Sequence, residues 1–565
     1  TFRTPYASAC LQKDISKTSD FYRCIPLFAA LVFVSHPVQT QAVTYIAQRA
    51  ASLATLFYLG CLVMYIKARG SETSKKAGYA FYAAAILSAV LAMRTKEITF
   101  TLPVMVLLYE FMFLRGDIRK RVLYLLPLLL TMLIIPLSMM ITKGASMGAG
   151  SAGIDELTKM AGIADVSRWD YLNTQFRVIV TYIRLLFLPI HQNLDYNYPV
   201  YRTFFTAPIV LSFLFLLGIF CGGVYLLYRS FRSDQADRFW WRLIAFGIFW
   251  FFVTLSVESS IIPIVDVIFE HRLYLPSVGF VVAILSVIAL VQVRLAAPTK
   301  GVAKVFILVM ILAVISLSVT AYARNMVWRD AVTFWEDVVK KSPYKPRPHF
   351  YLGVAYHEQG RFDDAIREFL ATINLKPDYA WSYRNLGIAY HKKGHFDDAI
   401  KAFQKTIELM PDHADTYYNL GEAYHKQRRF DDAIRQYQTA MKLDSTLVAP
   451  HVNLGEVYHQ QGRFDDAIRE SQAAIKLKPD HARAYSNLGA AYHQQGRLDD
   501  AIREYQTSIN LKPDYADAHY NLGLAYQKQG RLDDAIKAYQ TATKLNPNLV
   551  SPLQHRDGSS NGRSP

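Results

Sequence analysis

Cysteine is scarce in this chain: its 565 residues contain four, at Cys10, Cys24, Cys61 and Cys221. No two of them stand in a CxxC spacing, so the sequence predicts neither a disulfide framework nor a zinc-finger site. The chain also lacks a P-loop, a GxGxxG turn after a strand and a GxSxG elbow. These absences exclude the nucleotide-binding and serine-hydrolase classes that such motifs mark.

Charged residues make up only 19% of the chain and hydrophobic residues 52%, but these averages combine two unlike parts. Long apolar runs dominate up to about Tyr322, whereas the chain from about Asp330 onward is polar and repetitive. The net charge of +16 would suit nucleic acid. Many of the basic residues, however, lie in short loops between apolar runs, where they set the orientation of a membrane protein. We therefore expect no nucleic-acid partner.

The first part predicts an all-α, polytopic bundle of transmembrane helices over 24–322, after a cytoplasmic segment 1–23. A span needs about 20 mostly apolar residues. About nine segments qualify, the first being short: 24–38, 46–66, 77–93, 98–114, 122–141, 205–228, 240–257, 273–293 and 302–321. The apolar segment 176–190 carries Arg177 and Arg184 and is predicted to lie at the membrane surface as an interfacial or re-entrant helix.

Basic residues gather in alternate loops, which places those loops on the cytoplasmic side. These loops are 67–76, 115–121, 229–242 and the one after Val293. The opposite, outer face then receives the polar loops and everything beyond 321. The polar loops are 36–49, 94–97, 142–203 and 257–272.

The second part, 330–547, repeats every 34 residues, with a glycine recurring from Gly353 to Gly523 inside a unit of the form NLGxAYH. This period predicts a tetratricopeptide-repeat superhelix with a concave groove, of about six repeats after a degenerate first half at 331–342. The tail 548–565 is predicted to be disordered.

The outer loops combine cations with carboxylates. Fixed cations at a membrane surface suit a phosphate-bearing substrate. The candidate phosphate ligands are His36, Arg49, Arg94, Lys96 and Arg272. Among the carboxylates Glu97, Glu258, Asp266 and Glu270, the candidates for acid–base chemistry are Glu97 and Glu270. The alternative is that these charges are ion pairs that anchor helix ends. We expect no metal site in the residues, although a role for a divalent ion stays open.

An asparagine recurs on the first helix of five repeats, at Asn385, Asn419, Asn453, Asn487 and Asn521. A row of amides can hydrogen-bond an extended peptide backbone whatever its sequence, and it can equally tie neighbouring repeats together. Two further series have simpler explanations. The Asp-Asp pair that opens each second helix is predicted to cap it. The recurring histidines lie too far apart, about 10 Å, to share a metal ion.

Four stretches joined to these repeats resemble one family. They are HPVQTQAVTYIAQR (36–49), RTKEITFTLP (94–103), NLDYNYP (193–199) and EHRLYLPSVGF (270–280). They look like the membrane O-mannosyltransferases with tetratricopeptide repeats and their bacterial relatives, glycosyltransferases of the GT-C type. The resemblance implies transfer of a hexose, expected to be mannose, from a polyprenyl-phosphate sugar to Ser or Thr of a protein bound by the repeats. His36, Arg49, Lys96, Glu97, Glu270 and Arg272 match the family's outer-loop motifs.

The chain departs from that family in two ways. The family usually carries its catalytic acid in a first outer loop, which we expect upstream of Thr1, so the catalytic acidic loop is expected to be missing from an N-terminally incomplete chain. Gln41 also stands where the family has Glu. The alternative function is a membrane-anchored scaffold without catalysis. The outer face is periplasmic in a bacterial inner membrane, or the lumen of the endoplasmic reticulum in a eukaryote.

Overall fold

The computed structural model describes residues 21–40, 49–70, 74–114, 116–138, 166–233, 235–259, 267–294 and 300–549. Those residues form helices and loops and no strand, as the all-α prediction requires. The chain divides after Pro348 into two compact units, which we describe separately. The expected boundary near residue 330 is thus shifted, because residues 342–347 hydrogen-bond to the segment around Asp195 in the first unit.

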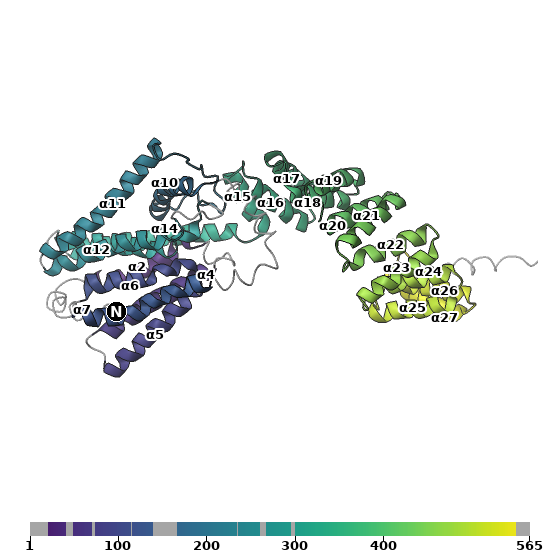
Figure 1. The fold of residues 1–565 in the computed structure, drawn as a ribbon, viewed down its shortest axis with the longest axis horizontal. Coiled ribbons are helices and arrows are strands. Elements are labelled where there is room, and N and C mark those ends of the chain that lie inside the picture. The colour runs from purple at the N-terminus through teal and green to yellow at the C-terminus, as the bar shows by residue number, and fades with distance from the viewer. Residues whose placement is uncertain are drawn as a thin grey trace, which may run out of the picture. The chain divides into compact units, whose positions relative to one another are not determined.

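The first unit contains eleven α-helices among the described residues, and several long ones run side by side (Figure 1). They are α2 (Phe21–Ser35), α4 (Arg49–Arg69), α5 (Lys75–Met93), α6 (Leu102–Phe113), α7 (Ile118–Leu130), α10 (Arg168–Phe187), α11 (Ala207–Arg232), α12 (Gln235–Leu255), α13 (Pro276–Arg294), α14 (Lys300–Val327) and α15 (Ala331–Lys341). Short 3-10 helices interrupt the connections at η1 (Pro37–Gln39), η3 (Glu97–Thr101), η4 (Thr131–Leu133) and η5 (Glu270–Leu273).

Six helices within the described residues are long and apolar enough to cross a membrane. They cover 50–69, 75–93, 118–138, 207–232, 237–255 and 304–327, and shorter apolar helices cover 25–35 and 276–291. The fourth predicted span, 98–114, is broken: it begins as η3 and continues as the 12-residue α6. Pro103 in the first turn of α6 explains the start, since proline lacks the N–H that a continuous helix would need there.

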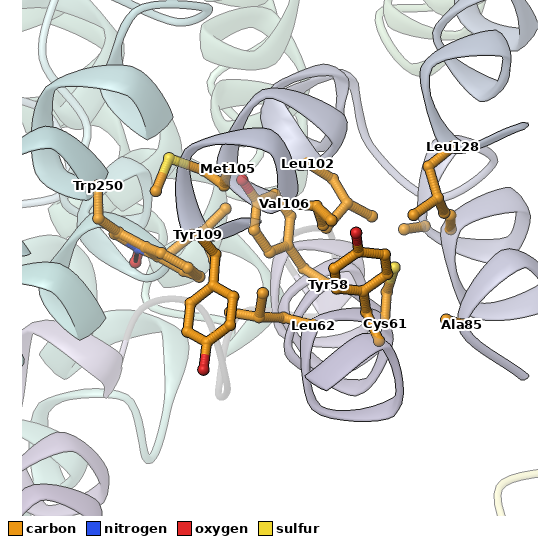
Figure 2. Packing of buried hydrophobic residues seen from close by; sticks show 14 of the residues in the cluster. Tyr58, Cys61, Leu62, Ala85, Leu102, Met105, Val106, Tyr109, Leu128 and Trp250 are labelled. Carbon is orange, nitrogen blue, oxygen red and sulfur yellow. Dashed lines mark hydrogen bonds between the residues drawn. The ribbon is translucent and has the colours of Figure 1, made fainter. Parts of the chain in front are cut away.

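One hydrophobic core of the first unit lies where α4, α5, α6, α7 and α12 meet (Figure 2). Tyr58 of α4 is fully buried and meets the ring of Trp250 of α12 edge to face, with 5.3 Å between the ring centroids. The indole N–H of Trp250 donates to the carbonyl of Leu275, 2.9 Å away. This bond fixes the start of α13 against α12, because a buried indole N–H needs an acceptor.

Helices α12 and α13 approach each other at backbone contact. A Cβ atom on Gly247 would lie 2.5 Å from the carbonyl oxygen of Gly279. One on Gly279 would lie 2.6 Å from the carbonyl oxygen of Gly247 and from Cδ1 of Trp250. Small residues allow this closeness between membrane helices, where van der Waals packing supplies much of the association.

The second unit consists of six helix pairs, shown in green to yellow in Figure 1. Their helices are α16 (Pro346–Glu358), α17 (Phe362–Leu375), α18 (Ala380–Lys392), α19 (Phe396–Leu409), α20 (Ala414–Lys426), α21 (Phe430–Leu443), α22 (Val448–Gln460), α23 (Phe464–Leu477), α24 (Ala482–Gln494), α25 (Leu498–Leu511), α26 (Ala516–Lys528) and α27 (Leu532–Leu545). The recurring glycine lies where the two helices of a pair meet, and a Cβ on Gly421 would lie 2.6 Å from the Tyr437 ring.

The turn between the paired helices needs a positive φ, which glycine supplies in five repeats, from Gly360 to Gly530. The third repeat has Arg428 at this position, with φ of 60°. A side chain in the left-handed region costs about 1–2 kcal/mol relative to glycine. This repeat therefore has a strained turn that its neighbours do not share.

The Asp-Asp pairs differ in detail from the capping prediction. The N-cap residue is the preceding Arg or His, and the aspartates occupy the first turn, where they favour the helix dipole. The first aspartate also joins adjacent repeats: Asp397 accepts from Gln427 at 2.7 Å. Four of the recurring histidines pack against phenylalanine rings, as His391 does on Phe396. Both series are therefore structural.

Candidate functional site

Three polar loops of the first unit are joined by side-chain contacts. The Gln39 amide of η1 donates to Ser277 Oγ at 2.9 Å, which links the loop at 36–40 to the start of α13. Lys96 Nζ lies 2.8 Å from Oε1 of Glu258, which links the loop before η3 to the segment after α12. The residues Gln39, Lys96, Glu258, His271 and Arg272 are called the loop cluster below.

Among the described residues of the loop cluster, two side-chain acceptor oxygens are buried without a partner, Oε1 of Gln39 and Oε2 of Glu258, and only the second belongs to a carboxylate. The side chain of Glu258 is 9% exposed, and its Oε1 pairs with Lys96. Its Oε2 is buried and has no hydrogen-bond partner among the described residues. A buried carboxylate oxygen without a donor is costly in a folded protein. A substrate hydroxyl is one group that could satisfy it.

Arg272, an expected phosphate ligand, is buried. Its guanidinium donates to the Tyr171 hydroxyl and to the Val267 carbonyl, both at 3.2 Å, and stacks over Phe269. Next to it, burial together with the charges of Lys96 and Arg272 lowers the pKa of His271 to about 2. His271 is therefore neutral at physiological pH. The hydrogen bonds of Arg272 fix the η5 loop, and its guanidinium adds positive charge to the loop cluster.

His36 likewise has a structural role. Its Nδ1 accepts from the Val38 N–H at 3.2 Å, and its Nε2 lies 3.0 Å from the Leu186 carbonyl. Because a carbonyl only accepts, Nε2 carries the proton and both ring nitrogens are used. Burial lowers the pKa of His36, which keeps the ring neutral. We therefore revise the expected phosphate contact: His36 ties η1 to the end of α10.

Glu270, expected as a catalytic candidate, is fully engaged. Its Oε1 accepts from the Asn193 N–H at 2.7 Å and from the Tyr196 hydroxyl at 2.5 Å, and its Oε2 accepts from the Gln192 amide at 3.0 Å. The side chain is buried, and burial raises its pKa. This carboxylate anchors the segment 192–196 to η5, so the geometry gives it a positioning role.

The NLDYNYP stretch is held from its other side by the end of α15 and the residues after it. Ser342 Oγ donates to the Asp195 carbonyl at 2.6 Å. The Asp195 carboxylate, itself buried, pairs with Lys345 and Arg347, each at 2.6 Å. Helix α15, which the repeat pattern predicted as part of a degenerate repeat, packs Phe334 and Val338 against Leu194 of this stretch.

Five further residues that the sequence singled out are not among the named members of the loop cluster. Arg94 and Glu97 are exposed. Gln41 and Asp266 lie outside the described residues, as does the side chain of Arg49. Within the described part of the chain, no three His, Cys, Asp or Glu side chains are arranged to hold a metal ion.

The asparagine row of the repeats divides into two groups. Asn453 is buried and donates to the Tyr418 hydroxyl of the preceding repeat at 3.2 Å. Asn487 donates to the Val452 carbonyl, also in the preceding repeat, at 3.0 Å. These two have the structural role that the sequence offered as the alternative. Asn385, Asn419 and Asn521 are half-buried and remain candidates for peptide binding.

Comparison with family models identifies the repeats. Models described as "TPR repeat" match residues 353–394, 455–496 and 491–530. Models described as "Tetratricopeptide repeat" match 378–446 and 516–549. Among solved structures, the crystal structure of MamA is 32% identical over 29% of this chain and 95% of its own, with a TM-score of 0.27. That of YrrB is 22% identical over 34% of this chain and 97% of its own, with a TM-score of 0.29.

Curated relatives match a larger part of the chain. Protein O-mannosyl-transferase F38B6.6 of Caenorhabditis elegans is 23% identical over 65% of this chain and 48% of its own length. Protein O-mannosyl-transferase TMTC3 of Homo sapiens is 23% identical over 64% of this chain and 40% of its own length. The chain thus spans less than half the length of the relatives it matches. The expected resemblance is confirmed: this chain is a relative of proteins named O-mannosyl-transferases, and its second unit is built of tetratricopeptide repeats.

Proposed function

We propose that this chain is a membrane glycosyltransferase that moves a hexose, expected to be mannose, from a polyprenyl-phosphate sugar to Ser or Thr of a protein. The observation that carries the proposal is the buried Oε2 of Glu258, to which no described residue donates a hydrogen bond, while Lys96 holds the other oxygen. The relatives named O-mannosyl-transferases and the six apolar helices support the reaction class and the membrane setting.

In this proposal Glu258 Oε2 accepts the proton of the acceptor hydroxyl as that oxygen attacks the anomeric carbon. The bond from this carbon to the phosphate oxygen breaks, and the phosphate leaves with the bonding electrons. Lys96 and the exposed Arg94 offer positive charge to that phosphate. Arg272 supplies further positive charge and holds the η5 loop in place. The reaction needs no oxidant, and the proton leaves the carboxylate to water.

The chemistry is tested by Glu258→Gln, which keeps the side-chain volume but removes the base. We expect kcat for transfer from polyprenyl-phosphate mannose to a Ser/Thr peptide to fall about 10²-fold or more, since general base catalysis contributes that much. The KM for the peptide should change little. Lys75→Ala is the control, because Lys75 is exposed at the opposite end of α5 from Lys96. A Glu258→Gln protein with the parent kcat would remove Glu258 from the mechanism.

We further propose that the repeats bind the acceptor protein through the available asparagines. Replacing Asn385, Asn419 and Asn521 by alanine should weaken binding of an extended acceptor peptide about tenfold or more, since each lost bond contributes about 1 kcal/mol. The melting temperature of the repeats should stay the same. Asn453→Ala is the matched control, and it should lower the melting temperature instead. Unchanged peptide affinity in the triple variant would leave the row with only a structural role.

The outer loops and the repeats are proposed to lie on the same side of the membrane, opposite the basic loops. In this arrangement, a reporter fused after Asn546 lies in the outer compartment and shows its activity there. A reporter in the loop 67–76 is active only in the cytoplasm. Cytoplasmic activity of the first fusion would contradict the arrangement.

The second candidate is a membrane-anchored scaffold that gathers proteins without catalysis. The repeats favour it, since stacked helix pairs present extended binding surfaces. The transfer assay separates the two: peptide binding with no sugar transfer by the unmodified chain would support the scaffold.

A further inference from the structure

Helix α10 has two functional faces. One face is buried and reaches the loop cluster, because Tyr171 donates to the Glu258 carbonyl at 3.1 Å and Gln175 to the Val267 carbonyl at 3.0 Å. The other carries Arg177, Thr181 and Arg184, whose spacings of four and three place them in one row along the helix. This second row takes no part in the proposed function.

A cavity of about 840 Å³ lies along the Arg177–Arg184 row. The segment 191–201 and the last turns of α15 close it, so all its walls belong to the first unit. Four Lys or Arg residues line the cavity against a single carboxylate, that of Asp337. We call it the α10 cavity. Its lining is strongly positive.

Most of that positive charge is available to a ligand. Lys341 is committed, since it binds Asp337 and the Gln192 carbonyl. Asp337 is in turn shared with Arg324. Arg177, Arg184 and Lys340 are exposed, and among the described residues they form no ion pair with a carboxylate. The α10 cavity thus offers three accessible cations that no carboxylate of the described residues neutralises.

The remaining lining favours a hydroxylated ligand. The Tyr198 hydroxyl lies 2.9 Å from Thr181 Oγ1, and Tyr201 and Asn197 add further polar groups. The volume falls in the range of pockets for drug-sized molecules, about 300–1,000 Å³, and greatly exceeds that of a single phosphate. An anionic group attached to a polyhydroxylated one would match both the charge and the size.

The surroundings of the α10 cavity indicate that the ligand is attached to a lipid. Tyr201 lies six residues before α11, whose Ala207–Arg232 is long and apolar enough to cross the membrane. Immediately after Arg184, three apolar side chains are exposed: Phe187 at 58%, Leu188 at 59% and Ile190 at 52%. Such residues at a membrane surface bury themselves among acyl chains.

We propose that the α10 cavity binds the hydroxylated phosphate headgroup of a membrane lipid, with Arg177, Arg184 and Lys340 on the phosphate. The lipid chains then lie along Phe187, Leu188 and Ile190. The site is separate from the loop cluster and does not depend on the transfer reaction. Two lipid sources share this chemistry, a polyprenyl-phosphate sugar and a glycerophospholipid with a hydroxylated headgroup.

The test compares the full chain with the double variant Arg177→Ala, Arg184→Ala. Native mass spectrometry in detergent would measure binding of polyprenyl-phosphate mannose, phosphatidylglycerol, and soluble mannose 1-phosphate. We expect at least one of the two lipids to bind the parent tightly and the double variant about tenfold or more weakly, because two charge-assisted contacts are lost. The control is Arg168→Ala, Arg202→Ala, which removes two exposed arginines of the same region that do not line the cavity.

The outcomes separate this proposal from the proposed function. Affinity lost for the polyprenyl lipid alone identifies it as the ligand, and affinity lost for phosphatidylglycerol identifies a structural or regulatory lipid. Equal lipid affinities in the parent and the double variant would overturn the proposal even if sugar transfer is observed. Equal binding of soluble mannose 1-phosphate and of the lipids would overturn the lipid attachment. A monodisperse elution profile of the double variant shows that any loss does not reflect misfolding.

Discussion

Replacing Gly279 by alanine is expected to remove most of the folded protein from a detergent extract. The new Cβ would lie 2.6 Å from the carbonyl oxygen of Gly247 and from the ring of Trp250. The first obstacle is backbone, so α12 and α13 must move apart, and Trp250 would strain its bond to the Leu275 carbonyl. One overpacked methyl group costs about 1–3 kcal/mol even where side chains can adjust. Gly279→Val should reduce the amount of folded protein further.

The matched controls are Gly218→Ala and Gly222→Ala in α11, where a Cβ would meet nothing within 4 Å. Both controls add the same methyl group to an apolar helix. Thermal unfolding followed by size-exclusion chromatography would show a large loss for Gly279→Ala and parent-like behaviour for the controls. A Gly279→Ala protein as stable as the controls would mean that α12 and α13 are not in backbone contact.

Replacing Glu270 by alanine should be the second most damaging change. It leaves three buried donors without an acceptor: the Gln192 amide, the Asn193 N–H and the Tyr196 hydroxyl. Each unsatisfied buried donor costs about 1–3 kcal/mol. We expect a large fall in melting temperature, together with rapid proteolysis between α10 and α11. The melting temperature of the Glu270→Gln variant should fall much less, because the amide oxygen of the glutamine can still accept from Asn193 and Tyr196.

The glutamine variant also decides between positioning and catalysis. If Glu270 only positions the loop, Glu270→Gln is stable and transfers sugar at close to the parent rate. A stable but inactive Glu270→Gln protein would restore the catalytic role that the sequence motif suggested. The same assay on Glu258→Gln then identifies which carboxylate performs the chemistry.

The helices and the repeats could be predicted from the sequence because they depend on local signals. Apolar runs longer than a bilayer needs and a 34-residue period do not depend on distant contacts. The break in the segment 98–114 had a local signal as well, Pro103, which a hydropathy average hides. The start of the second unit after Pro348 had no local signal in the sequence, because it depends on the distant pairing of Asp195 with Lys345 and Arg347.

The roles within the site could not be predicted, because they depend on which distant groups meet each side chain. Glu258 and Glu270 are both acidic residues in one predicted outer loop. Only the fold shows that Glu270 meets three donors, while one oxygen of Glu258 meets none in the described part of the chain. The sequence predicted His36 as a phosphate ligand for the same reason. The group that accepts its proton, the Leu186 carbonyl, lies 150 residues away along the chain.

The turn at Arg428 has a consequence for how the repeat array comes apart. In stacked repeats, stability is the sum of each unit and its interfaces with adjacent units, so unfolding begins at the weakest unit. The other turns relieve the positive φ with glycine, whereas the turn between α20 and α21 keeps its strain. Cooperativity should therefore be interrupted there. Amide hydrogens of α20 and α21 should exchange before those of the flanking pairs, and the array should behave as two folding blocks joined at its third repeat.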